Sequence, residues 1–262
     1  MRSGGRMPRG SMAALVTASG LVALVVGATA LVRSLRARQR IAARALNETL
    51  PVNSAWWRAR AKAEGELLLV TLGDSAAQGI GASEPGLGYV GILADRIAHR
   101  SGLSVRTVNL SVSGATVEQT IGYQLPRLAK LQPDIVTVSI GANDIASWDA
   151  RSFEIALAAV LDAVPRHAIV ADLPYFYLPG NERKVAAANG IVHRLARDRG
   201  LAVAPLHATT KGAGILGALT LFAGDRFHPN DRGYEVWASA FAPLVDKRVD
   251  EVLSERSTHP PR

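Results

Sequence analysis

The regular alternation of short apolar runs with helical patterns constrains the fold of this chain more than any other feature. The apolar runs have the length of strands, and the segments between them carry apolar residues at helical spacing. The expected strands are 67–72, 105–110, 135–140, 168–171 and 201–204, and the expected helices are 89–99, 117–131 with a break near Pro126, 153–164, 182–199 and 231–253. Elements that take turns in this way form a parallel sheet with helices on both faces. We therefore predict an α/β fold, a three-layer αβα sandwich around a five-stranded parallel sheet.

Small and polar residues follow several of these expected strands. Gly73-Asp74-Ser75 comes after the first strand, Ser113-Gly114 after the second and Asn143 after the third. Parallel sheets bind ligands outside the carboxyl ends of their strands, where the following loops converge. We therefore expect these residues to be neighbours in space although they are far apart in the sequence.

Ser75 is the leading candidate for a nucleophile. It lies in LLLVTLGDSAAQGIG, where an apolar strand gives way to a segment whose glycines allow a sharp turn and leave main-chain N–H groups free. Taken alone, Gly-Asp-Ser is as compatible with an ordinary turn. A serine hydroxyl also needs a base, usually a histidine held by a carboxylate. Cysteine is absent, which excludes disulfides, thiolate metal sites and cysteine nucleophiles.

His228 has the best sequence context for that base. It lies in GDRFHPNDRGY, with Asp225 three residues earlier and Pro229 directly after it. This places an imidazole on a short, rigid turn close to a carboxylate, although a plain helix-entry turn would have the same residues. The other histidines lack an Asp nearby in the sequence and are predicted to be structural or solvent-exposed: His99, His167, His193, His207 and His259.

Acyl transfer further requires donors for the oxyanion that develops on the substrate. The main-chain N–H groups of Ser75 and Gly114 and the side-chain amide of Asn143 lie on three neighbouring loops and could supply them. Each also has a simpler interpretation, since Gly114 could be a turn glycine and Asn143 could cap its own loop.

Four segments together resemble the sequence blocks of SGNH (GDSL-type) hydrolases. They are GDS at 73–75, the glycine of SVSGAT at 114, GAND at 141–144 and DRFH at 225–228, in the right order and on the right loops. The resemblance extends over about 67–244 and implies a flavodoxin-like SGNH hydrolase fold. It departs from the family pattern after Ser75, where Ala76-Ala77 replaces the usual Leu-Ser or Leu-Thr. The α/β-hydrolase elbow GxSxG is absent, because its last position is Ala77.

The resemblance also implies roles for the candidate residues. Ser75 would be the nucleophile, His228 the base and Asp225 its orienting partner, with an oxyanion hole formed by Ser75, Gly114 and Asn143. It implies cleavage of a small acyl ester or thioester through an acyl-enzyme, as in esterases and lipases, without metal or organic cofactor. The alternatives are an O-deacetylase of envelope carbohydrate or a catalytically inactive, membrane-tethered binding module. The apolar and aromatic loop 173–179 favours an acyl ester.

The positive charge of the chain is confined to its N-terminal quarter. Residues 1–62 hold 11 Lys and Arg against Glu48 alone, whereas the remainder holds 19 basic and 21 acidic residues. The expected catalytic part is therefore close to neutral, which disfavours binding to nucleic acid. Basic residues that flank an apolar segment are more typical of contact with lipid headgroups.

The apolar segment 11–32 carries no charge and lies between Arg9 and Arg33. At about 1.5 Å per residue it reaches ~30 Å, enough to cross a bilayer core. We predict an uncleaved transmembrane helix as anchor; a signal peptide cleaved after Ala28-Thr29-Ala30, giving a secreted protein, is the alternative. The side of the membrane stays open. The expected organisation is a basic N-terminus at 1–10, the anchor, a basic juxtamembrane linker at 33–64, the catalytic domain at 65–253 and a polar tail at 254–262.

Overall fold

The computed structural model describes residues 29–30 and 33–258. It contains the predicted five-stranded sheet, with β1 (Leu67–Gly73), β2 (Val105–Asn109), β3 (Ile135–Ser139), β4 (Ile169–Ala171) and β5 (Ala202–Ala204). All neighbours are parallel, in the order β2-β1-β3-β4-β5. The chain therefore leaves β1 toward one edge and continues from β3 toward the other. Sheets of this kind bind ligands at that point of reversal, between the carboxyl ends of β1 and β3.

The two central strands are buried on both faces. Six of the seven residues of β1 and all five residues of β3 are buried, which explains why their sequences are continuous apolar runs instead of alternating ones. Thr71 of β1 and Thr137 of β3 are buried polar residues within these apolar runs, and their hydroxyl groups bond to each other across the two strands. This pair satisfies two polar groups that would otherwise be costly to bury.

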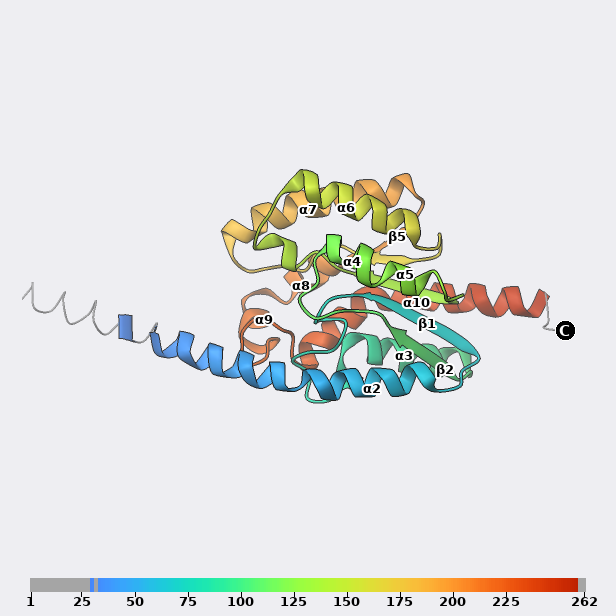
Figure 1. Cartoon of the computed structure of the whole chain (residues 1–262), viewed down its shortest axis with the longest axis horizontal. Coiled ribbons are helices and arrows are strands. Elements are labelled where there is room, and N and C mark those ends of the chain that lie inside the picture. Colours follow the sequence, from blue (N-terminus) through green and yellow to red (C-terminus); the bar gives the residue numbers. More distant parts are fainter. Residues whose placement is uncertain (1–28, 31–32, 259–262) are drawn as a thin grey trace, which may run out of the picture.

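Helices cover both faces of the sheet, which gives three layers (Figure 1). On one face, α3 (Tyr89–Ser101) and α10 (Asp231–Thr258) pack through Tyr89, Leu93 and Phe241. On the other, α4 (Val117–Tyr123), α6 (Ala150–Ala163) and α7 (Pro179–Asp198) pack against β1, β3 and β4. The predicted α/β fold with a parallel sheet is thus confirmed.

The predicted helix 117–131 is divided into α4 and α5 (Leu125–Leu128). Gln124 lies at the break, and its side chain points into the core. Its amide oxygen accepts from the Gly73 N–H at 2.9 Å, and its amide nitrogen donates to the Gly73 carbonyl at 2.8 Å. The end of β1 is therefore held by a side chain from the layer above it, two residues before Ser75.

Several short elements were not expected from the sequence. They are the 3-10 helices η1 (Pro85–Leu87) and η2 (Asn143–Ile145) and the helices α8 (Leu206–Gly212) and α9 (Gly214–Thr220). Each lies in the connection that follows a strand of the sheet, after β1, β3 or β5. Their apolar runs are too short to establish a helical period, so pattern alone does not reveal them.

The segment 33–64, predicted to be a basic juxtamembrane helix and linker, is mostly helical. Residues 33–48 are helical, and α2 (Leu50–Lys62) follows and packs against β2. Asn53 and Trp57 of α2 are buried, and both side chains donate to the Gln78 carbonyl, at 2.9 and 3.0 Å. Helix α2 therefore belongs to the folded domain and supports the loop that carries Ser75.

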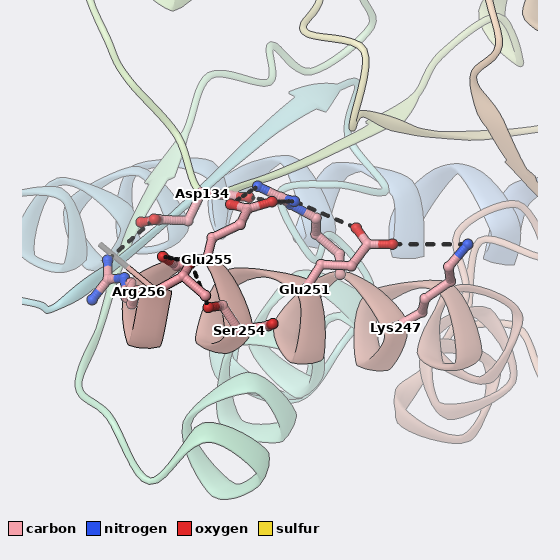
Figure 2. Close-up of polar contacts among 8 residues, drawn as sticks. Asp134, Lys247, Glu251, Ser254, Glu255 and Arg256 are labelled. Atoms are coloured by element: carbon pink, nitrogen blue, oxygen red, sulfur yellow. Dashed lines mark hydrogen bonds and ion pairs between the residues drawn. The ribbon is translucent and has the colours of Figure 1, made fainter. Parts of the chain in front are cut away.

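The polar tail expected from residue 254 is likewise part of the fold, since α10 continues to Thr258. Figure 2 shows the polar network that holds this end. Arg256 bonds to the Asp134 carboxylate at 3.1 Å, and Arg248 bonds to the Asp134 carbonyl at 3.0 Å and to Glu255 at 2.9 Å. Asp134 also accepts from the Leu68 N–H at 2.7 Å, so the network ties α10 to the amino end of the sheet.

The predicted anchor at 11–32 lies outside the described residues except for positions 29 and 30. Among the residues that are described, none of the helices combines the length and the hydropathy needed to cross a bilayer. His259 and the rest of the expected tail beyond Thr258 also lie outside the described residues.

Candidate active site

Ser75 lies on the first turn after β1, at the carboxyl end of the central strand, and is buried. The turn is formed by Asp74, whose carboxylate accepts from the Ala76 N–H at 2.9 Å. Gly73 permits it, because a Cβ at that position would lie 2.7 Å from the Ser139 carbonyl oxygen of β3 and 2.7 Å from Ala77 Cβ. The local sequence Gly-Asp-Ser thus gives a strand end that can bend sharply directly beside β3.

His228 contacts both Ser75 and Asp225. Its Nε2 lies 2.9 Å from Ser75 Oγ, and its Nδ1 lies 2.6 Å from Asp225 Oδ2. A carboxylate acceptor at Nδ1 favours the tautomer with its hydrogen on that nitrogen, which leaves Nε2 to accept from the serine hydroxyl. The three residues therefore form a continuous hydrogen-bonded row across the rim of the sheet.

Asp225 is held in its ionised form. Burial alone would raise the pKa of its carboxyl, but hydrogen bonds from the His228 ring and from the N–H groups of Phe227 and His228 outweigh that effect and lower the pKa. Arg226, which lies between Asp225 and Phe227 in the sequence, adopts the left-handed conformation at φ 58°. This unusual backbone angle curls the turn so that the carboxylate and the imidazole face the same side.

A glycine that sequence reasoning missed brings the histidine turn to the serine loop. Gly81 has φ +102°, and a Cβ there would lie 2.3 Å from the Pro229 carbonyl oxygen and 2.9 Å from His228 Cβ. Asp231 adds a second link, because it accepts from the N–H and the hydroxyl of Ser83, each at 2.7 Å. The glycines of the run QGIG after Ser75 were the only sequence indication of this close approach. The residues that approach Gly81, His228 and Pro229, are about 150 residues away in the sequence.

Asn143, in η2 after β3, lies on the wall of the same pocket as Ser75. Its side-chain amide donates to the Ala115 carbonyl at 3.0 Å and faces Asp74 Oδ2 at 3.3 Å. Gly114 is next to Ala115 on the adjoining loop, is exposed and has a φ of +77°. It does not line the pocket. Within residues 29–30 and 33–258, neither the Ser75 nor the Gly114 N–H donates to a protein acceptor.

Asp74 is a site residue whose role the sequence pattern does not reveal. Its two carboxylate oxygens face the Ala76 N–H and the Asn143 amide, so it positions both the serine turn and the asparagine. Burial raises the pKa of its carboxyl to about 6, against the opposing effects of the Ala76 hydrogen bond and of the nearby His228. Asp74 is therefore an acid whose protonated form is favoured by the site.

A pocket of about 330 Å³ opens beside Ser75 and His228. The loop 173–178 after β4 forms one wall of it, as expected from the sequence. The remaining apolar lining comes from α9 and the segments that follow it, and includes Ala218, Leu221, Phe222, Phe227, Val236 and Trp237. Most of the lining is thus suited to an apolar group, and its polar residues include Ser75, His228, Asn143, Asn181, Thr210 and Arg226.

Two further histidines have acidic partners, which corrects the prediction that they lack one. His193 Nε2 lies 3.1 Å from Asp172, and His207 Nε2 lies 3.0 Å from Glu182. The partners come from other elements and are invisible to local sequence spacing. Glu182 also accepts from the Phe176 N–H, and so holds the pocket loop. Neither histidine bonds to Ser75.

Comparison with known proteins shows the class of protein, a carboxylic ester hydrolase, and the family. Residues 71–236 match the model of the GDSL-like Lipase/Acylhydrolase family, and the chain belongs to it. No curated protein matches the sequence.

Several solved structures share the fold. TesA is 24% identical, with a TM-score of 0.58 over 69% of this chain and 99% of TesA. A variant of Axe2, an acetyl xylan esterase from Geobacillus stearothermophilus, is 23% identical, with a TM-score of 0.57. The match covers 69% of this chain and 94% of Axe2. The psychrotrophic esterase EstA from Pseudoalteromonas sp. is 20% identical, with a TM-score of 0.55 over 71% and 100%. At these identities the likeness is one of fold.

Proposed function

We propose that this protein cleaves carboxylic esters through an acyl-enzyme on Ser75, with His228 as general base and Asp225 as the residue that orients it. The observation that carries the proposal is the row of two hydrogen bonds from Asp225 through His228 to Ser75 Oγ, at 2.6 and 2.9 Å. A serine hydroxyl is a weak nucleophile until a base within hydrogen-bonding distance removes its proton.

In the first half of the reaction, Ser75 Oγ attacks the carbonyl carbon while His228 Nε2 takes the hydroxyl proton. The tetrahedral intermediate collapses as the imidazolium returns that proton to the leaving alcohol or thiol. Water then attacks the acyl-enzyme, again with His228 as base, and releases the acid and Ser75. Asp225 stays ionised throughout and stabilises the imidazolium, in keeping with its lowered pKa.

The oxyanion hole in this proposal consists of the Ser75 and Gly114 N–H groups and the Asn143 side chain. Both N–H groups lack a protein acceptor within the described part of the chain, and Asn143 lies on the pocket wall beside Ser75. The bond from Asn143 to the Ala115 carbonyl holds the asparagine against the Gly114 loop. Donors that are fixed before the reaction stabilise developing charge without reorganisation.

The pocket lining supports an ester with an apolar acyl group. Aromatic and aliphatic side chains of the loop 173–178, of Phe222 and of Trp237 surround the space beside the reacting serine. A sugar substrate, as in O-deacetylation of envelope carbohydrate, would rely on polar lining residues such as Asn181, Thr210 and Arg226, which the apolar ones outnumber. We also propose that residues 11–32 anchor the protein in a membrane, since they form an uncharged segment of bilayer length flanked by arginines.

Hydrolysis of a panel of p-nitrophenyl esters from acetyl to dodecanoyl, with acetylated xylan as a further substrate, tests this proposal on the full chain. We expect kcat/KM to rise from acetyl toward medium-length acyl groups, and Ser75→Ala to reduce it by at least ~10⁴-fold with an unchanged fold by circular dichroism. A Ser75→Ala protein with wild-type turnover would refute the nucleophile. Preference for acetylated xylan over every acyl ester would instead favour the deacetylase alternative.

A further inference from the structure

Helix α9 is apolar on all sides although only one of its sides is covered. Gly217 is buried, and a Cβ there would lie 2.6 Å from the Tyr177 hydroxyl oxygen, so this side faces the pocket loop. Ala218, next to it, lines the pocket. The opposite side presents Ile215, Leu216 and Leu219, which are 82%, 73% and 63% exposed. A helix that is apolar all round is normally buried in protein or in lipid.

Two more large apolar side chains are exposed at the pocket, to whose lining α9 contributes Ala218. Leu178 and Phe227 line the pocket and are themselves more than half exposed. We name these five exposed apolar side chains, Ile215, Leu216, Leu219, Leu178 and Phe227, the α9 face. The chain from 206 to 224, which includes α8 and α9, contains no Asp or Glu and only Lys211 as a charged residue. Nothing acidic in this stretch would oppose contact with an apolar or anionic surface.

The N-terminal helical segment connects this face to the apolar segment 11–32. A Cβ at Gly224, four residues after α9, would lie 3.1 Å from Ala42 Cβ, so residues 33–48 run past the end of α9. Figure 1 shows this segment in blue, projecting beyond the rest of the domain. From Ala42 back to Arg33 the helix covers ~14 Å. Arg33, the residue that follows the apolar segment in the sequence, thus lies about that far along the helix from the contact with the loop between α9 and Asp225.

The same helical segment is strongly basic. Its residues 33–41 are exposed, and it has a single acid, Glu48. Its five arginines are Arg33, Arg36, Arg38, Arg40 and Arg44. Arginines directly after an apolar segment are attracted to anionic lipid headgroups. Apolar side chains beside a basic helix are the composition of a surface that lies in the interfacial layer of a bilayer.

From these observations we propose that the α9 face rests on the bilayer surface, with the mouth of the pocket turned toward the lipid. The bilayer would cover the side chains that the fold leaves exposed, and the arginines of 33–48 would contact its headgroups. An ester that is dissolved in the membrane could then enter the pocket past Leu178 and Phe227 without crossing water. The substrate class is accordingly an amphiphilic acyl ester of the lipid phase, a refinement that rests on the proposed function.

The absence of cysteine allows a direct test on the full chain, because one introduced cysteine is a unique labelling site. The Leu219→Cys variant is labelled with the environment-sensitive fluorophore NBD. The labelled protein is then mixed with vesicles of phosphatidylcholine and phosphatidylglycerol. Ile155→Cys is the matched control, since Ile155 on α6 is also 63% exposed but lies on the far layer of the sheet. We expect NBD at position 219 to shift to the blue and to be quenched by acyl-chain-brominated lipid more than about twofold relative to position 155.

Three outcomes contradict the proposal. NBD at 219 could stay open to aqueous iodide as at 155, the protein could fail to sediment with the vesicles, or NBD could be shielded from iodide without quenching by brominated lipid. The last outcome would show that a second copy or the chain's own N-terminal segment covers α9. These readouts need no turnover and can be repeated with Ser75→Ala, so they stand apart from the proposed catalysis.

A double variant, Leu216→Ser with Leu219→Ser, tests the link to substrate. Neither residue lines the pocket. We expect wild-type turnover of a soluble short-chain ester and at least ~threefold slower hydrolysis of a long-chain ester carried in the same vesicles, because the apolar contact with lipid is lost. Equal effects on both esters would contradict delivery from the membrane.

Discussion

Two histidine–carboxylate pairs lie near the same rim of the sheet, and they differ in what surrounds them. His228 bonds to Asp225 at 2.6 Å, and its second ring nitrogen faces the Ser75 hydroxyl. His207 bonds to Glu182 at 3.0 Å, and the second oxygen of that carboxylate holds the Phe176 N–H of the pocket loop. The chemical groups are nearly the same, but one pair ends on the Ser75 hydroxyl and the other on the backbone.

The difference shows that a histidine paired with an acid is not by itself a catalytic feature. In the His228 pair, the partner Asp225 comes from the same turn, three residues earlier. The absence of a side chain at Gly81 lets that turn lie against the serine loop. In the His207 pair, the partner comes from α7, and the result is a fixed loop wall. The first pair therefore serves proton transfer in our proposal, and the second positions the pocket.

Removing each histidine should separate the two pairs most strongly. His228→Ala deletes the base and is expected to lower kcat by ~10⁴-fold or more, whereas His207→Ala should lower it less than about tenfold. Steady-state kinetics on a short-chain ester, with circular dichroism to verify folding, makes the comparison. Losses of similar size in the two variants would contradict the assigned roles.

Neutralising the two acids should give a smaller but qualitatively different contrast. Asp225→Asn removes the charge that stabilises the imidazolium, so kcat should fall by ~10³-fold or more. Glu182→Gln keeps an acceptor for Phe176 but loses the charge that faces His207, so we expect a change in KM and in acyl-length preference with kcat nearly unchanged. The ester panel measures both, and a collapse of kcat in Glu182→Gln would overturn the positioning role.

Asn143→Ala tests the oxyanion hole and should cost ~10²- to 10³-fold in kcat with little change in KM, because the donor acts on charge that develops in the transition state. Lys184→Ala is a control on a neighbouring contact, since Lys184 bonds to the carbonyl of Ile145 in the same short helix. A loss in Asn143→Ala that appears in KM alone would argue against an oxyanion role.

The two carboxylates of the rim should give opposite dependences of stability on pH. The pKa of Asp74 is raised from 3.8 to about 6 by burial, so the native state retains a proton that the unfolded state releases, and this contribution to stability falls as pH rises from about 4 to 6. The pKa of Asp225 is lowered, so its contribution is present above the unfolded value of 3.8 and is lost as pH falls through its folded value.

Denaturant unfolding of the wild type and of Asp74→Asn at several pH values tests the first of these dependences. The free energy of unfolding of the wild type relative to Asp74→Asn should fall by on the order of 3 kcal/mol between pH 4 and 7, since each unit of pKa shift corresponds to about 1.4 kcal/mol. A difference that is constant across this range would show that Asp74 titrates normally.

The sequence was sufficient for features that depend on local pattern. The strands follow from continuous apolar runs, and Ser75, Asp225 and His228 follow from short motifs at strand and helix ends. It did not reveal features that depend on tertiary partners. Glu182 and His207 are 25 residues apart, the effect of Gly81 depends on Pro229, and the buried side of α2 depends on the Gln78 carbonyl. Helices α8 and α9 were missed because short, Gly-rich segments have no clear period.

The central claim, that Ser75 is the nucleophile activated by His228, is tested most directly by covalent labelling. The full chain is treated with a fluorophosphonate, and the modified residue and its stoichiometry are determined by mass spectrometry in the wild type, in Ser75→Ala and in His228→Asn. The account predicts one adduct per chain on Ser75, none in Ser75→Ala and labelling slowed by ~10²-fold or more in His228→Asn. An adduct on another residue, or equally fast labelling of Ser75 without His228, would contradict it.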